Sequence, residues 1–245
     1  MRGRDLPGQF ATAATLRSDA WWLAPLLTVL ALGAFVVYTT WAALQGAHYE
    51  YKSYLSPFYS PTFKPSWWPF SPAILILWAP GGFRLTCYYY RKAYYRSFWG
   101  APPACAVRDA RARYTGETGF PLILQNVHRY FFYAAAVVLI FLWYDAAVAF
   151  VFDGRFGVGL GSLILLANVV LLTGYSLSCH SCRHLCGGNL DRFSSSPARY
   201  RAWKVVSALN ERHMLWAWTS LFSVALADVY VRLLSMGVLN DTRFF

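Results

Sequence analysis

The densest group of metal-binding side chains lies in one short stretch of the 245-residue chain, SCHSCRHLCGG, residues 178–188. On a helix, at about 100° per residue, its three cysteines share one stripe and its two histidines share another. Thiolate and imidazole are ligands for zinc, haem iron and iron–sulfur clusters, so this stretch predicts a metal centre. The residues are Cys179, Cys182, Cys186, His180 and His184.

Two further histidines stand where helices are expected to begin. His128 lies in QNVHRY and His213 in NERHMLW, and each follows an asparagine by two or three residues. Each can point into a helix bundle at the same depth as the cysteines. We therefore expect the ligands to come from Cys179, Cys182, Cys186, His128, His184 and His213, with Cys87 as the next candidate.

Three kinds of centre compete for these residues. A haem b needs two axial imidazoles on facing helices, which His128 and His213 can supply, but it leaves the cysteines without a role. A structural zinc ion needs four ligands, and Cys179 with Cys182 supplies only one spaced pair. A Rieske-type [2Fe–2S] cluster takes two cysteines on one iron and two histidines on the other, which is the mixture that the sequence offers.

The elements that hold these residues are expected to be membrane helices. Only 13% of the residues are charged, 57% are hydrophobic and the net charge is +11. This composition excludes a disordered chain and argues against a water-soluble nucleic-acid binder. The prediction is an all-α, polytopic bundle in one domain, residues 1–245. Its expected spans are residues 21–44, 67–83, 130–152, 158–177 and 214–239, and an interfacial amphipathic helix is expected over 83–99.

The positive charges predict how the bundle is oriented. If all five segments span, 17 of the 22 lysines and arginines fall on one side of the membrane and 5 on the other. Positive residues favour the cytoplasmic side. The N-terminus is therefore predicted to be cytoplasmic and the C-terminus to lie outside. All five cysteines and four of the five histidines then map to the cytoplasmic side.

Aromatic and cationic side chains alternate in the predicted interfacial helix. Such a face anchors a helix in the headgroup layer, and it can also line an interfacial quinone pocket. The candidate quinone-binding residues are Tyr88, Arg91, Tyr95, Arg96 and Trp99.

Three charged residues fall inside the predicted spans: Asp145, Asp228 and Arg232. Because Arg232 follows Asp228 by one helical turn, an intramembrane ion pair is the expected arrangement. A membrane transporter that uses these residues is the alternative function.

Three blocks carry a resemblance to a known family. TCYYYRKAYYRSFWGAPPACAV (residues 86–107), RYTGETGFPLILQNVHRYFFY (113–133) and SLSCHSCRHLCGG (176–188) resemble the membrane-anchor subunit of actinobacterial succinate dehydrogenase, respiratory complex II. The similarity extends over most of the chain.

The resemblance implies a subunit that is not catalytic alone. It implies a complex in the plasma membrane with two partners, a flavoprotein that oxidises succinate and an iron–sulfur subunit. The resemblance is also compatible with a homo-oligomer of the whole complex. The anchor would relay electrons to a membrane quinone, either menaquinone or ubiquinone, and the resemblance favours menaquinone. Anchors of this kind are thought to use a Rieske-type [2Fe–2S] centre, whereas better-known classes hold haem b.

Overall fold

A computed structural model describes residues 17–107, 119–120, 122–188 and 190–245. Five helices form the bundle: α1 (Leu23–Gln45), α2 (Ile74–Thr86), α4 (His128–Val148), α5 (Leu160–Leu177) and α8 (His213–Ser235). Shorter helices connect them: η1 (Pro57–Tyr59), α3 (Tyr88–Phe98), η2 (Leu122–Val127), α6 (His180–Arg183), η3 (His184–Gly188), η4 (Phe193–Ser195) and α7 (Pro197–Glu211). Two small hairpins complete the described fold: β1 (Glu50–Tyr51) with β2 (Tyr54–Leu55), and β3 (Val151–Phe152) with β4 (Arg155–Phe156).

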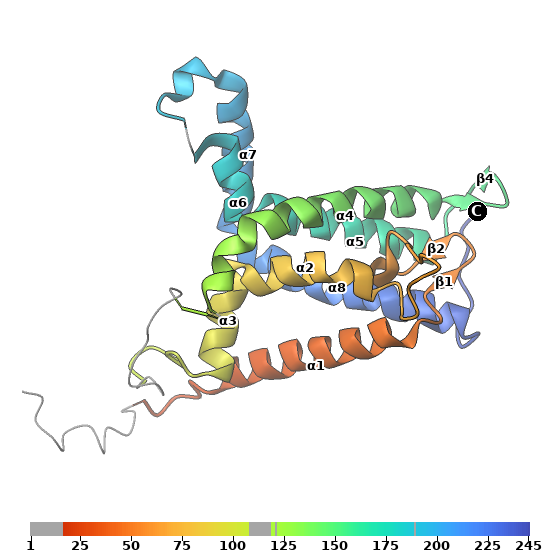
Figure 1. Ribbon diagram of the computed structural model, residues 1–245, viewed down its shortest axis with the longest axis horizontal. Coiled ribbons are helices and arrows are strands. Elements are labelled where there is room, and N and C mark those ends of the chain that lie inside the picture. The colour runs from red at the N-terminus through yellow and green to blue at the C-terminus, as the bar shows by residue number, and fades with distance from the viewer. Residues whose placement is uncertain (1–16, 108–118, 121, 189) are drawn as a thin grey trace, which may run out of the picture.

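The five bundle helices run side by side along one axis and alternate in direction (Figure 1). Their connections therefore gather at two ends. One end, here called the hairpin end, holds both β-hairpins and the C-terminus. The other, here called the ligand end, holds α3, α6 and the first turns of α1, α4 and α8. From the ligand end, α6 and α7 project away from the bundle as an arm. The all-α class predicted from the sequence is confirmed.

Helix α2 begins later than the sequence suggested. The apolar run starts at Trp67, but the helix starts at Ile74 and has 13 residues. Pro65, Pro69 and Pro72 explain the delay, because proline donates no backbone hydrogen bond and disfavours helical geometry in the residue before it. At 1.5 Å per residue, α2 covers about 20 Å, which is shorter than a hydrocarbon core of about 30 Å.

The expected interfacial helix over 83–99 is divided at Cys87. This residue is extended, with φ −62° and ψ 130°, so α2 ends before it and α3 begins after it. Helix α3 then lies across the ligand end, near the start of α1 (Figure 1). The other predicted spans agree with α1, α4, α5 and α8 to within four residues at each end.

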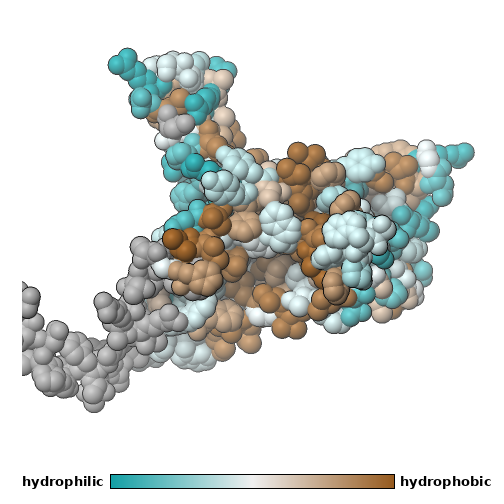
Figure 2. All heavy atoms as spheres, in the orientation of Figure 1, coloured by the Kyte–Doolittle hydropathy of each residue, from teal (hydrophilic) through white to brown (hydrophobic). Residues whose placement is uncertain are grey.

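The outer surface of the bundle is apolar. Figure 2 shows hydrophobic side chains over the middle of the bundle, and hydrophilic ones on the projecting arm and at the tip of the hairpin end. Large side chains such as Val37, Ile140 and Phe222 are more than half exposed. Within the described residues, four helices are long and apolar enough to cross a membrane, namely α1, α4 with the end of η2, α5 and α8. The exposed apolar surface therefore faces lipid.

Near the hairpin end, one buried ion pair joins α8 to the rest of the bundle. Arg232 Nε donates to the Asp228 carboxylate at 3.3 Å, and Asp228 is fully buried. The same carboxylate accepts from Tyr38 Oη at 2.5 Å and from the Ser56 hydroxyl. Arg232 also donates to the Ala47 carbonyl at 2.9 Å. The predicted ion pair is thus confirmed. The further hydrogen bonds of its two side chains connect α1 and the first hairpin segment to α8.

Asp145, the third intramembrane charge, lies apart from this pair. It is half-buried and accepts a hydrogen bond from the Ser60 hydroxyl.

Replacing Asp228 by alanine should destabilise the fold strongly, because it leaves the Arg232 cation and two hydroxyls without their acceptor. Removing one member of a buried pair costs about 3–5 kcal/mol. Asp145→Asn, which keeps an oxygen acceptor for Ser60, should cost about 1 kcal/mol or less. Unfolding free energies in mixed detergent micelles measure both, and equal losses would contradict the role given to the ion pair.

Candidate metal centre

Two cysteines occupy the extended residues that separate one helix from the next. Cys87 joins α2 to α3, and Cys179, with φ −69° and ψ 145°, joins α5 to α6. Both thiols are buried and free of disulfides. Because these two residues are not helical, their side chains do not belong to the helix faces that pack against neighbouring helices. They can point along the bundle axis, toward the ligand end.

Two histidines are the first residues of helices that begin at the ligand end. His128 is the first residue of α4 and His213 the first residue of α8, as the sequence indicated. His128 Nε2 lies 3.0 Å from Cys179 Sγ, and His213 Nε2 lies 3.3 Å from Cys87 Sγ. Each contact therefore joins a helix start to a helix junction, and the two contacts bring four separate segments together.

The other nitrogen of each imidazole is held by a hydroxyl. His128 Nδ1 lies 2.8 Å from Thr86 Oγ1, and His213 Nδ1 lies 2.6 Å from Ser178 Oγ. Thr86 and Ser178 each directly precede one of the two cysteines. A ring whose Nδ1 is held in this way turns Nε2 toward the cavity and its thiols, which is the arrangement found around metal-binding histidines.

Aromatic rings fix the planes of both imidazoles. Phe83 stacks on His128 with centroids 5.0 Å apart and an interplanar angle of 7°. Tyr175 stacks on His213 at 5.3 Å and 15°. Phe83 and Tyr175 are themselves buried, so the two rings have little freedom to turn away. Orientation is thus set on two sides, by a hydrogen bond and by a stacked ring.

A cavity of about 200 Å³ lies between these four side chains. Exposed His180, Tyr88 and Lys92 border it, so it opens at the ligand end of the bundle. Asn210 also lines it and donates to the Ser178 carbonyl at 2.6 Å. This carbonyl belongs to the residue whose hydroxyl holds His213, so Asn210 steadies the wall behind that histidine.

Burial determines the protonation of the Cys179 thiol. It raises the pKa of Cys179 to about 12, although the Ser181 N–H lies 3.4 Å from the sulfur. At neutral pH the thiol is therefore protonated and unreactive by itself. A metal ion would displace this proton, since metals bind the thiolate.

The donor set fits a two-iron cluster with mixed ligands. Two thiols and two imidazoles face one cavity, with both Nδ1 atoms already engaged. Within the described residues, no three His, Cys, Asp or Glu side chains converge closely enough for a single metal ion. A mononuclear zinc site would need such a convergence, whereas a two-iron cluster takes its ligands in two pairs.

The remaining expected ligands lie outside this cavity. Cys182 is buried beside Cys186, and burial, with the neighbouring thiol, raises the pKa of Cys182 to about 12. His184 is exposed, and its Nδ1 lies 3.1 Å from an Arg129 guanidinium nitrogen. The structure thus brings together Cys179, His128 and His213 of the expected set, and it adds Cys87.

The candidate quinone residues lie on α3 and, in the case of Trp99, directly after it. Tyr88 is exposed and borders the cavity between the two thiols and the two imidazoles, here called the metal-site cavity. The Arg91 guanidinium lies 5.3 Å from the centre of the Tyr88 ring. Tyr95 packs edge-on against Trp99 at 5.4 Å. Arg96 lies in the last turn of α3.

Sequence reasoning placed Cys87 after the other candidates and did not use the hydroxyls of Thr86 and Ser178. The signal was present, because Thr-Cys at 86–87 and Ser-Cys at 178–179 repeat one pattern at the ends of two apolar runs. At the end of each run, the thiol is a candidate metal ligand, and the hydroxyl before it is a hydrogen-bond partner for a candidate histidine ligand.

An apolar bundle with thiols and imidazoles gathered at one end defines a membrane subunit with a candidate metal centre. The model of the family described as actinobacterial succinate dehydrogenase subunit SdhC matches residues 23–237. The chain therefore belongs to this family and is a subunit of a succinate dehydrogenase.

A solved structure agrees with this assignment. A chain of the Mycobacterium smegmatis Sdh1 complex in the apo form is 51% identical, with a TM-score of 0.87 over 94% of each chain. No relative matches among curated proteins.

Close packing of α5 on α8 positions His213. A Cβ at Gly174 would lie 2.5 Å from the Trp216 ring, whereas a Cβ at Gly33 on α1 would meet nothing within 4 Å. Gly174→Ala should therefore separate α5 from α8 and lower the thermal midpoint of the complex. Gly33→Ala gains helix propensity of about 1 kcal/mol and should do neither. Differential scanning calorimetry of the complex measures both variants, and a neutral Gly174→Ala would count against this packing role.

Proposed function

We propose that the chain anchors succinate dehydrogenase in the membrane and relays its electrons to a quinone through a Rieske-type [2Fe–2S] centre. The observation that carries this proposal is the convergence of Cys87, Cys179, His128 and His213 on one cavity. Cys87 and Cys179 would hold one iron and His128 and His213 the other. When bound, such a centre supplies one-electron transfer at a potential above that of an all-cysteine cluster.

The chain's own residues prepare this site in three ways. Thr86 and Ser178 hold the imidazoles at Nδ1, at 2.8 Å and 2.6 Å, so that each Nε2 points to a thiol. The Ser181 N–H lies against the Cys179 sulfur at 3.4 Å, a contact that favours the thiolate. Burial in the aromatic cluster restricts access of water to the ligands. Hydrogen bonds to sulfur and exclusion of solvent are the means by which a protein adjusts the potential of an iron–sulfur group.

The ligand end of the bundle is proposed to face the cytoplasm. Of the described positive charges, Arg91, Lys92, Arg183 and Lys204 lie on α3, α6 and α7 at this end, consistent with the positive-inside rule. Membership in a succinate dehydrogenase family implies a flavoprotein and an iron–sulfur subunit as partners. They would dock at this end, because the metal-site cavity opens here.

The quinone is proposed to be menaquinone, as the resemblance to actinobacterial anchors implies.

The overall reaction balances in electrons and protons. Oxidation of succinate to fumarate releases two electrons and two protons. Reduction of a quinone to a quinol consumes two electrons and two protons. The residues of this chain supply the route for the electrons, while water at the membrane surface supplies the protons.

Electron paramagnetic resonance of the dithionite-reduced three-subunit complex tests the centre. A Rieske-type centre has a lower average g value than an all-cysteine cluster, and this signal should be present in the wild type. His128→Ala, His213→Ala, Cys87→Ser and Cys179→Ser should each remove it and abolish quinone reduction. Each change deletes a ligand, so the iron that it holds is lost.

Matched controls exist in the same chain. His184→Ala, Cys182→Ser and Cys186→Ser change the same residue types outside the cavity and should retain the signal. Haem absorbance in the wild type with no Rieske signal would replace this proposal by a haem b anchor. Loss of the signal in Cys182→Ser or Cys186→Ser, with Cys87→Ser unaffected, would move the ligand set to the α6–η3 segment.

A further inference from the structure

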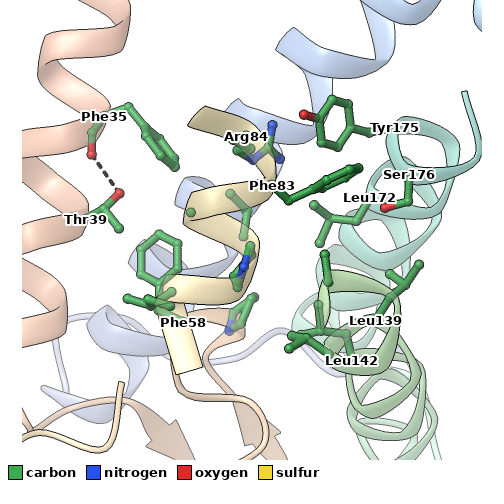
Figure 3. Close-up of a pocket in the computed structure, with 17 residues that line it drawn as sticks. Phe35, Thr39, Phe58, Phe83, Arg84, Leu139, Leu142, Leu172, Tyr175 and Ser176 are labelled. Atoms are coloured by element: carbon green, nitrogen blue, oxygen red, sulfur yellow. Dashed lines mark hydrogen bonds between the residues drawn. The ribbon is translucent and has the colours of Figure 1, made fainter. Parts of the chain in front are cut away.

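A cavity at the hairpin end differs in its lining from one deeper in the bundle. The deeper one, of about 120 Å³ and here called the apolar groove, lies among the five bundle helices and is lined almost entirely by hydrocarbon (Figure 3). The one at the hairpin end has about 210 Å³ and a mainly polar lining, and we call it the hairpin cavity. Side chains from the first hairpin, from β3 and from the C-terminal segment meet around it.

Backbone contacts fix the C-terminal segment beside this cavity. The Phe244 N–H donates to the Val158 carbonyl at 2.9 Å, and Arg243 pairs with Gly159 as in an antiparallel sheet. The Arg243 guanidinium lies 4.2 Å from the centre of the Phe152 ring. Because Phe152 is buried and also lines the cavity, the cation is held at the cavity wall.

The turn of the first hairpin supplies a second cation. Lys52 directly follows β1, and its φ of 54° is the left-handed conformation that a two-residue hairpin turn uses. Its ammonium lies 5.3 Å from the centre of the Tyr51 ring. Lys52 and Arg243 are both exposed and both line the hairpin cavity, so the cavity opens to the surface between two cations.

One carboxylate, Asp241, also lines the cavity, but its oxygens are engaged by the protein. It accepts hydrogen bonds from Tyr54 Oη and Tyr230 Oη, each at 2.7 Å, and from the Gly161 N–H at 3.1 Å. Three donors from three segments thus hold this carboxylate and disperse its charge.

The two cations are left without a counter-charge. Within the described part of the chain, neither Lys52 nor Arg243 forms an ion pair. The acidic residues of the two hairpins, Glu50 and Asp153, do not line the cavity. Two cations face one dispersed carboxylate, so the hairpin cavity favours an anionic occupant.

Exposed aromatic rings lie beside the cavity. Phe156 is 71% exposed and Phe245 is 72% exposed, and their ring centroids are 6.0 Å apart. Phe156 is on the same hairpin as Phe152, and Phe245 follows Arg243 by two residues. In Figure 2 the apolar surface of the bundle gives way to a hydrophilic tip at this end. Cations at such a boundary lie at the level of phospholipid headgroups.

We propose that the hairpin cavity binds the phosphate of an anionic phospholipid. The Lys52 ammonium and the Arg243 guanidinium contact the phosphate oxygens, as their chemistry favours. An acyl chain lies along Phe156 and Phe245. The lipid joins the first hairpin to the C-terminal segment, at the end of the bundle away from the metal-site cavity, so this inference does not depend on the proposed redox centre.

Native mass spectrometry of the delipidated three-subunit complex in detergent micelles tests the site. Added dioleoyl-phosphatidylglycerol, which has a net negative charge, should bind more tightly than dioleoyl-phosphatidylcholine, which has none. Lys52→Gln and Arg243→Gln should each weaken phosphatidylglycerol binding about fivefold. Neither change should alter the binding of phosphatidylcholine, because its choline cation already offsets the phosphate charge.

Matched controls remove the same charges outside the cavity. Lys64→Gln and Arg155→Gln should bind phosphatidylglycerol like the wild type, since neither residue lines the hairpin cavity. Arg243→Lys keeps the charge and should bind within about twofold of the wild type, which separates loss of charge from loss of local structure. Equal affinity for the two lipids, equal losses in the control variants, or displacement of the lipid by millimolar inorganic phosphate would each overturn the proposal.

Discussion

Burying two thiols and two imidazoles at one end of an apolar bundle constrains every helix around them. A buried polar group without a partner costs free energy, and more so where lipid replaces water. Here each imidazole is engaged at both nitrogens, by a hydroxyl and by a thiol. These contacts cross between four segments of the chain. The ends of α2 and α5 and the starts of α4 and α8 are therefore held at one level, and the rest of the bundle is built to keep them there.

The helix ends perform this task through their backbone. Cys87 and Cys179 are extended residues between helices, whereas His128 and His213 are first residues of helices. Ligands at ends and junctions can converge along the axis, while residues in the middle of a helix face sideways into a neighbour or lipid. The lateral faces are thus left free for close packing, as at Gly82, where a Cβ would lie 2.2 Å from the Phe131 ring.

The two ends of the bundle solve different problems. The hairpin end neutralises its buried charges internally, with Asp228 and Arg232 paired and hydrogen-bonded to hydroxyls and a carbonyl. These contacts hold α1, α8 and the first hairpin segment together. The ligand end instead leaves donors around a cavity and a cation, Arg84, beside an apolar groove. Phe83 and Tyr175 line this groove and stack on His128 and His213, so the same two rings orient the imidazoles and form part of the groove's wall.

Composition and periodicity determined the class of this protein and the approximate position of each long helix, because lipid demands apolar runs of a fixed length. They also determined that His128 and His213 begin helices and that Asp228 pairs with Arg232, since both follow from local sequence. The choice among five cysteines was not local. Cys182 and Cys186 have the spacing of a motif, yet neither lines the cavity, because the chain after Cys179 turns into α6 and the arm formed with α7. Cys87 has no motif, and it meets His213, 126 residues later in the sequence, only because the fold brings the end of α2 to the start of α8. Tertiary packing alone decided which thiols face the imidazoles.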